Sequence, residues 1–199
     1  MIVSCDQDGI AAAYEAVKNG GIVVFPTDTV YGIGCDPFNE KAVRAIYRIK
    51  GREGSKQLPV LGSSIIDISK IAILDELSNR LASKFWPGPL TLILPIKEKK
   101  IAKSLGLGKK IAVRVPNHPC VLELLKKCGL LVGTSANLSG QRSPADATEI
   151  IGKLEGYDVL LDGGAIQNSV ESTIVEVIGN KLHMVRKGKI SEEELLSLV

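Results

Sequence analysis

Apolar and polar residues follow two alternating patterns along most of the chain. Apolar positions three or four residues apart, as in 39–50, predict a helix with one buried face. Short unbroken apolar runs, as in IVVF at 22–25, predict buried strands. The two patterns alternate from the start of the chain to residue 162, which is typical of an α/β fold.

The end of the chain departs from this alternation. Two strand-like runs, 172–177 and 181–185, are joined by Ile178-Gly179-Asn180, which predicts an antiparallel hairpin and therefore a mixed sheet. Expected strands cover 22–25, 58–62, 91–95, 111–116, 130–135, 158–162 and this hairpin. Expected helices cover 8–21, 39–50, 75–86, 120–129, 146–154 and 191–199.

Helix caps and one lysine-rich segment complete the expected secondary structure. Asp8 and Asn39 are the candidate N-caps of the first two helices, and Gly20 is the candidate residue just past the end of the first helix. Ser191 has Glu194 three residues later, which predicts a capping box at the start of the last helix. We expect the segment 97–110 to be an exposed loop or hairpin arm.

Composition indicates a globular protein with an aliphatic core. Apolar residues make up 45% of the 199 residues, and a formal charge of +3 is too small to indicate nucleic-acid binding by itself. The length and the lack of a linker-like break predict one domain over 1–199. Without a signal peptide or an apolar run of roughly 20 residues, we expect a cytoplasmic protein with no membrane contact.

The four cysteines, Cys5, Cys35, Cys120 and Cys128, show no CxxC spacing. A chain of this size does not need disulfides to fold, so we expect reduced thiols. His118 and Cys120 have no third ligand nearby, so we expect no bound zinc.

Polar clusters follow several of the apolar runs directly, where ligands bind in α/β folds. KGREGSK contains Lys50, Arg52 and Lys56 together with two glycines, which suits binding of a polyphosphate. The alternative is a loop that is basic because it faces water. The spacing is not that of a Walker A motif. The other clusters are PTDTVYGIG at 26–34, AVRVPNHP at 112–119, GTSANLSGQRSP at 133–144, and ESTIV at 171–175 with VRKGKI at 185–190.

Two of these clusters raise specific alternatives. GTSANLSG offers hydroxyls and an amide for a nucleoside or an amino acid, but Ser/Asn turns and helix caps are also common. Arg114 interrupts an aliphatic strand, so it either faces solvent or points into a cleft toward a carboxylate or phosphate. Arg186 poses the same choice. No GxSxG, HExxH or GxGxxG motif is present, which leaves positioning and charge stabilisation, as in nucleotidyl transfer.

Taken in order, the motifs PTDTVYGIG, KGR, WPGPLT, AVRVPNHP, TSANLSG, STIV and VRKG resemble those of the YrdC-like threonylcarbamoyl-AMP synthases, from about Gly20 to Ile190. The resemblance implies a twisted open mixed sheet flanked by helices, with a basic concave cleft, in the short single-domain form. It implies that L-threonine, bicarbonate and ATP, with Mg²⁺, give threonylcarbamoyl-adenylate and pyrophosphate. A partner complex would then modify tRNA with this product.

The resemblance also assigns roles to individual residues. It implies catalytic roles for Lys50 and Arg52 on the ATP phosphates. The implied ATP-binding residues are Lys50, Arg52, Lys56, Ser135, Asn137, Ser143 and Arg186. The implied threonine-binding residues are Thr29, Arg114 and Ser172, with Arg114 on the carboxylate. The chain departs from the family pattern at Leu61 and Lys110, so the contacts there stay open.

A second interpretation is a double-stranded RNA-binding or tRNA-binding protein of the same fold without synthase activity. Lysine and arginine contacts to phosphates would explain KGREGSK and 97–110 without catalysis. RNA affinity that falls steeply with salt, without turnover, would favour it. A third interpretation is a related carbamoyl-adenylate activity, as in hydrogenase maturation. Such domains occur in much longer chains with zinc-finger-like cysteines, which this sequence lacks.

Overall fold

The computed structural model describes residues 1–51, 57–179 and 181–198, and its strands form two sheets. In the five-stranded sheet, β9 pairs in parallel with both β1 and β2, and β3 runs antiparallel between β2 and β8. Its strands in spatial order are β1 Ile2–Ser4, β9 Val159–Asp162, β2 Val23–Phe25, β3 Gly32–Gly34 and β8 Thr134–Ser135.

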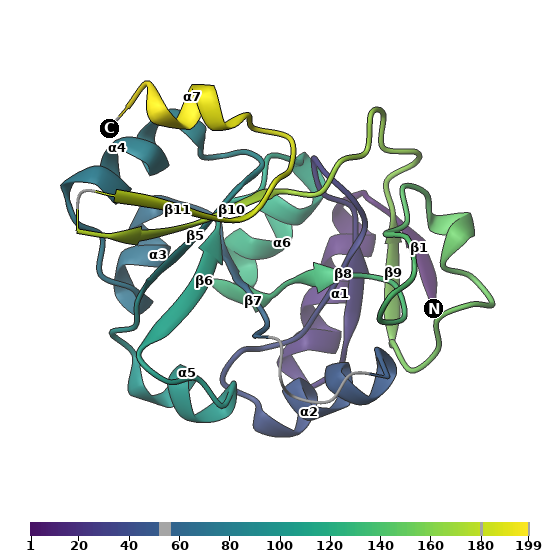
Figure 1. Ribbon diagram of the computed structural model, residues 1–199. Helices are drawn as coiled ribbons and strands as arrows, with labels where there is room; N and C mark the ends of the chain where they lie inside the picture. The colour runs from purple at the N-terminus through teal and green to yellow at the C-terminus, as the bar shows by residue number, and fades with distance from the viewer. Residues whose placement is uncertain (52–56, 180, 199) are drawn as a thin grey trace.

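The six-stranded sheet is also mixed. The pairs β10/β5 and β4/β6 are parallel, and the pairs β11/β10, β5/β6 and β4/β7 are antiparallel. Its strands in spatial order are β11 Lys181–Arg186, β10 Thr173–Ile178, β5 Leu90–Pro95, β6 Lys110–Arg114, β4 Val60–Gly62 and β7 Leu130–Val132. The N-terminal strand and the C-terminal hairpin lie on opposite sides of the molecule (Figure 1).

Helices pack around these sheets and divide the interior into two apolar clusters. Helix α1 packs on β2 and β9, helix α6 packs on β4 and β7, and the two helices pack together in the smaller cluster, whereas α2, α3 and α4 contribute to the larger one. The helices are α1 Gln7–Lys18, α2 Glu40–Ile49, α3 Ile65–Ile71, α4 Glu76–Phe85, α5 Lys99–Ser104, α6 Pro119–Cys128 and α7 Glu192–Leu196, with a 3-10 turn at Ala147–Glu149. Among the described residues, each helix is too short or too polar to cross a membrane.

The predicted α/β class and mixed strand directions are confirmed, but the strands are divided between two sheets. The chain passes from one sheet to the other at Gly133, between β7 and β8. A Cβ atom at Gly133 would come within 2.4 Å of the Leu61 side chain, so glycine allows this close crossing.

Most predicted caps are confirmed, and one is wrong. Asn39 caps α2, and Ser191 with Glu194 forms the capping box of α7. Gly20 follows α1 with a φ of 81°, a conformation that favours glycine. The N-cap of α1 is Asp6 and not Asp8, because the Asp6 carboxylate accepts the Gly9 N–H.

Two predicted segments differ from the structure. The segment 97–110 contains helix α5, because Ile101 and Leu105 are apolar anchors that pack into the core. Conversely, only the 3-10 turn forms within 146–154, where Gly152 has a φ of 75° that ends regular helical geometry.

The expectation of reduced thiols is wrong for one pair of cysteines, because Cys5 and Cys120 form a disulfide. Cys5 directly follows β1, and Cys120 lies in the first turn of α6. The Cα atoms of Cys5 and Cys120 are 5.5 Å apart, within the range for a disulfide. The pair is separated by 115 positions, so no local spacing signals it. Cys35 and Cys128 are free thiols, and burial raises the pKa of both, to about 12 for Cys128.

Candidate active site

A pocket of about 690 Å³ lies between the two sheets. One side is built from the five-stranded sheet and the loop 26–31, which joins β2 to β3. The other side is built from β4, β5, β6 and the ends of the β10/β11 hairpin. The polar clusters that follow strands in the sequence therefore converge, as the α/β pattern predicts.

Arg114, at the end of β6, is buried in the wall of this pocket with 7% of its surface exposed. Its Nη2 donates to Asp28 Oδ1 at 2.6 Å, its Nη1 to Thr29 Oγ1 at 3.0 Å, and its Nε to the Gly88 carbonyl at 2.9 Å. Burial lowers the pKa of Arg114, and the Asp28 charge opposes that shift. Of the two alternatives, the cleft-facing orientation is the correct one.

The hydroxyl of Thr29 contacts Arg114 and lies in the lining of the pocket. Thr27 Oγ1 lies 2.6 Å from the Val30 carbonyl and must use its single proton there. Both lone pairs of Thr27 Oγ1 are used by backbone N–H groups, those of Thr29 at 3.1 Å and Val30 at 3.2 Å, so Thr27 does not need the proton of the neighbouring Thr29 hydroxyl. Because Thr29 Oγ1 accepts from Arg114, one lone pair of Thr29 remains for a substrate N–H or O–H.

Tyr31, in the same motif, fixes the loop rather than lining the pocket. Its hydroxyl donates to the Gly164 carbonyl at 2.8 Å and accepts the Gly163 N–H at 3.0 Å. Burial raises the Tyr31 pKa to about 12, so the phenol stays protonated at neutral pH. The loop 26–31 is thus tied at its end to the turn after β9.

A second arginine, Arg186, lies at the end of the edge strand β11. Arg186 Nη1 donates to Glu171 Oε2 at 2.6 Å, and its Nη2 donates to Ser172 Oγ at 3.0 Å. Glu171 Oε1 accepts from Ser143 Oγ at 2.6 Å. Ser172 Oγ is also 2.9 Å from Thr91 Oγ1. This network joins the 133–144 segment to the start of β10.

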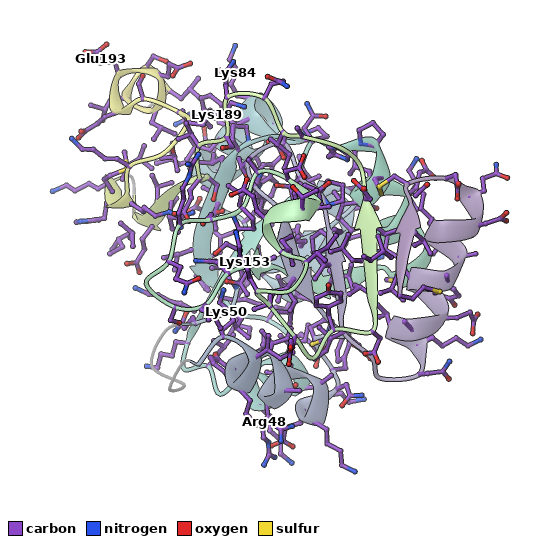
Figure 2. The ribbon with its side chains drawn as sticks, turned by 90° about the vertical axis from the view of Figure 1, so that its right-hand side faces the viewer. Arg48, Lys50, Lys84, Lys153, Lys189 and Glu193 are labelled. Carbon is purple, nitrogen blue, oxygen red and sulfur yellow. A yellow bond between two sulfur atoms is a disulfide. The ribbon has the colours of Figure 1, made fainter. Side chains whose placement is uncertain are left out.

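Lys50 connects the end of α2 to the segment after β8. Its Nζ donates to the carbonyl of Asn137 at 2.8 Å and to that of Ser135, and its side chain is buried. Figure 2 shows Lys50 directed toward the body of the protein and Arg48 on the outer side of α2. The buried ammonium therefore holds the TSAN segment in place as well as lining the pocket.

Most of the residues singled out in the sequence are brought together. The pocket is lined by Thr29, Lys50, Arg114, Ser135, Asn137, Ser172 and Arg186. Ser143 does not line it but contacts Glu171, which does. Arg52 and Lys56 lie outside the described residues.

The two departures from the family pattern differ in position. Leu61 lines the pocket, and on the adjacent parallel strand it is in register with Arg114. Lys110 does not line the pocket and pairs with Glu176 at the sheet surface. Lys110 is therefore removed from the site, whereas Leu61 forms an apolar wall beside the buried guanidinium.

Sequence reasoning missed the partners that hold these groups. Asp28, Glu171 and Thr91 were not assigned roles, although Asp28 and Glu171 belong to the motifs that were singled out. Thr91 is the last residue of WPGPLT, another of those motifs. Which carboxylate meets which arginine depends on strand order, which the sequence pattern does not give.

The pocket does not contain a built metal site among the described residues, where no group of three or more potential metal ligands is found. Both oxygens of Glu171, a lining carboxylate, accept hydrogen bonds from Ser143 and Arg186. Mg²⁺ commonly binds through substrate phosphates with few protein ligands.

A family model described as "Telomere recombination", that of the Sua5, YciO and YrdC proteins, matches residues 15–188. The chain belongs to the Sua5/YciO/YrdC family. This Sua5/YciO/YrdC protein is 36% identical over 204 residues to the Bacillus subtilis "Threonylcarbamoyl-AMP synthase", covering 99% of this chain and 58% of that relative. It is 38% identical over 182 residues to a "Putative threonylcarbamoyl-AMP synthase" of Methanocaldococcus jannaschii, covering 91% of this chain and 86% of that relative.

A solved structure of a Sua5/YciO/YrdC protein shares this fold. The Sua5 of P. abyssi complexed with L-threonine superposes with a TM-score of 0.92 and 31% identity, covering 100% of this chain and 61% of that one. The chain thus spans about three fifths of two of these relatives and most of the third.

Proposed function

We propose that the protein is a threonylcarbamoyl-AMP synthase, a nucleotidyltransferase that makes threonylcarbamoyl-adenylate from L-threonine, bicarbonate and ATP. The observation that carries the proposal is a single pocket whose lining combines three cations, Lys50, Arg114 and Arg186, with the hydroxyls of Thr29 and Ser172. Anionic substrates need such cations, and a pocket of this volume suits small molecules. The names of the relatives support the same reaction.

On the threonine side, we place the substrate carboxylate against Arg114. The guanidinium is already oriented by Asp28, Thr29 and Gly88, so binding does not have to order it. Thr29 accepts a hydrogen bond from the substrate ammonium or hydroxyl through the lone pair that Arg114 leaves unused. Ser172 supplies a further hydroxyl at the same pocket.

On the nucleotide side, Lys50 and Arg186 are proposed to meet the ATP phosphates, with Ser135 and Asn137 on the nucleoside. Ser143 acts through Glu171, whose carboxylate it holds. Arg52 and Lys56 remain proposed phosphate ligands, and Gly51 and Gln57 on either side of their segment line the pocket. Mg²⁺ enters bound to ATP as part of the substrate and offsets phosphate charge.

The reaction follows from holding these groups together. The amine of threonine and bicarbonate form a carbamate with loss of water. A carbamate oxygen then attacks the α-phosphorus of ATP, and the bond to the departing pyrophosphate breaks. Lys50 and Arg186 stabilise the charge that develops as pyrophosphate leaves, which is a main source of rate enhancement in such transfers.

We propose that residues 1–199 act as one domain, since the pocket is lined by residues from Phe25 to Arg186. The product would be used by a separate tRNA-modifying complex, which transfers the threonylcarbamoyl group to an adenosine beside the anticodon. ATP and tRNA are cytoplasmic, so we propose that the protein acts in the cytoplasm.

The test is pyrophosphate release by purified protein with ATP and Mg²⁺, omitting L-threonine or bicarbonate in turn. We expect release only when both are present, with a nucleotide product of the mass of threonylcarbamoyl-adenylate. Pyrophosphate release without threonine, or no release by folded protein that still binds ATP, would contradict the proposal. Salt-sensitive binding of double-stranded RNA without turnover would instead support a binding protein.

A further inference from the structure

The carboxylate of Asp28 contacts Arg114 but does not line the pocket, and it is directed at protein groups. Its Oδ1 accepts from Arg114 Nη2 at 2.6 Å and from the Asn117 backbone N–H at 2.8 Å. The Arg114 and Asp28 side chains are only 8% and 13% exposed. This buried pair spans the two sides of the pocket, because Asp28 follows β2 and Arg114 ends β6.

The Arg114 guanidinium carries five N–H donors, and its hydrogen bonds within the described residues account for three. These three bonds come from three different nitrogens, which fixes both the plane and the rotation of the group. Two N–H donors are left for a ligand, the number that a carboxylate accepts in a paired arrangement.

Charge around the pair shows why a carboxylate is needed at position 28. Arg186 lies close enough to repel Arg114, and the Lys189 ammonium donates to the Asp28 backbone carbonyl at 3.1 Å. Burial of a guanidinium beside other cations is unfavourable unless an anion is in contact with it. Asp28 is the anion in contact with Arg114.

We propose that Asp28 is a positioning residue that orients Arg114 toward the carboxylate of the amino-acid substrate without touching that substrate. The proposal rests on the function proposed above, in which Asp28 is only one of three groups that orient Arg114, and it adds that the charge of Asp28 sets the affinity for the substrate carboxylate. Loss of the Asp28 charge should weaken binding of the substrate carboxylate in particular. Binding of ATP, of the substrate amine and of the substrate hydroxyl should change little.

The test measures L-threonine and L-threoninol binding by isothermal titration calorimetry, because threoninol keeps the amine and hydroxyl but lacks the carboxylate. Asp28→Asn keeps the shape and one acceptor, and Asp28→Glu keeps the charge. The matched control is Asp158→Asn, since Asp158 also accepts a backbone N–H bond, from Ile22 at 2.7 Å, at the other end of β2. Thermal unfolding confirms that each variant is folded.

We expect Asp28→Asn to weaken threonine binding by on the order of tenfold and to leave threoninol binding unchanged. Asp28→Glu should recover part of the threonine affinity, and Asp158→Asn should match the wild type. An equal loss for threonine and threoninol would overturn the proposal, because it would mean that Asp28 contacts the substrate amine. Unchanged threonine binding in folded Asp28→Asn would also overturn it.

The same variants separate this inference from the proposed function. If wild-type protein forms the adenylate but Asp28→Asn keeps its threonine KM, only the role of Asp28 fails. If wild-type protein forms no adenylate, the proposed function fails. For the positioning role, we expect the threonine KM to rise while kcat and the ATP KM stay within about twofold of the wild type.

Discussion

Two arginines that line the same pocket each pair with a carboxylate at the same N–O distance of 2.6 Å, but the two pairs differ in exposure. The side chains of Arg114 and Asp28 are 8% and 13% exposed, whereas those of Arg186 and Glu171 are both 38% exposed. The first pair is shielded from water on both sides of the bond. The second is open to solvent, and Ser143 shares its carboxylate.

Equal geometry therefore does not mean equal energetics. A solvent-exposed ion pair contributes roughly 0–1 kcal/mol, because water and salt screen it. Removing one partner of a buried pair costs about 3–5 kcal/mol, because the other charge is left without compensation. We infer that the Arg114 pair is a fixed part of the site, whereas the Arg186 pair can exchange partners when phosphates bind.

The largest expected effect is that of Arg114→Met compared with Arg186→Met. Arg114→Met leaves the Asp28 carboxylate uncompensated, so urea unfolding should show about 3–5 kcal/mol lower stability. Arg186→Met should cost no more than about 1 kcal/mol. The double variant Arg114→Met with Asp28→Asn should be more stable than Arg114→Met alone. Similar losses of stability in Arg114→Met and Arg186→Met would show that the two ion pairs do not differ in energy.

The disulfide provides the second test, because Cys120 lies three residues after Asn117, whose N–H bonds Asp28. Replacing both Cys5 and Cys120 with alanine should lower stability by about 2–4 kcal/mol, since the crosslink restricts the unfolded chain. Cys128→Ala removes a free thiol and serves as the control. If the double alanine variant raises the threonine KM without changing the ATP KM, the disulfide supports the part of the pocket that contains Arg114 in particular.

The third test compares two cations on one helix. Lys50 is buried and bonded to backbone carbonyls, whereas Arg48 is exposed on the outer side of α2 (Figure 2). Lys50→Met should lower kcat/KM by about a hundredfold or more, and Arg48→Met should leave it unchanged. Steady-state pyrophosphate release measures both. Equal kcat/KM values for Lys50→Met and Arg48→Met would show that Lys50 has no part in the proposed mechanism.

The smallest expected effect concerns pH. Burial lowers the His118 pKa below its ordinary value, and its Nδ1 accepts the Cys120 N–H at 3.3 Å. The unfolded state therefore binds a proton first as pH falls below about 6.5, so this contribution to stability is present above that pH and is lost below it. His118→Asn should therefore flatten the acid side of a stability–pH profile, and a profile that the substitution leaves unchanged would contradict this prediction.

The sequence pattern predicted the elements whose signals are local. Strand β2 and helix α2 were correct because an unbroken apolar run and a capped amphipathic segment lie within a few residues. The segment 146–154 was wrong because its apolar spacing resembled a helix while Gly152 adopts a turn conformation. Local patterns gave no means to divide the strands between two sheets.

The candidate site was predicted in its residues more than in its contacts. Arg114 stood out as a charge within an aliphatic strand, and it does point into the pocket. Its partner Asp28 is 86 positions away, and Cys5 is 115 positions from Cys120. Such pairings depend on which strands become neighbours, so they require the tertiary structure.

The most direct test of a preformed carboxylate site is a crystal structure of this protein with L-threonine. We predict the ligand carboxylate within hydrogen-bonding distance of the two remaining Arg114 donors, with the Arg114–Asp28 and Arg114–Gly88 bonds retained. A bound threonine whose carboxylate lies elsewhere, or an Arg114 that leaves Asp28 to reach the ligand, would contradict this account.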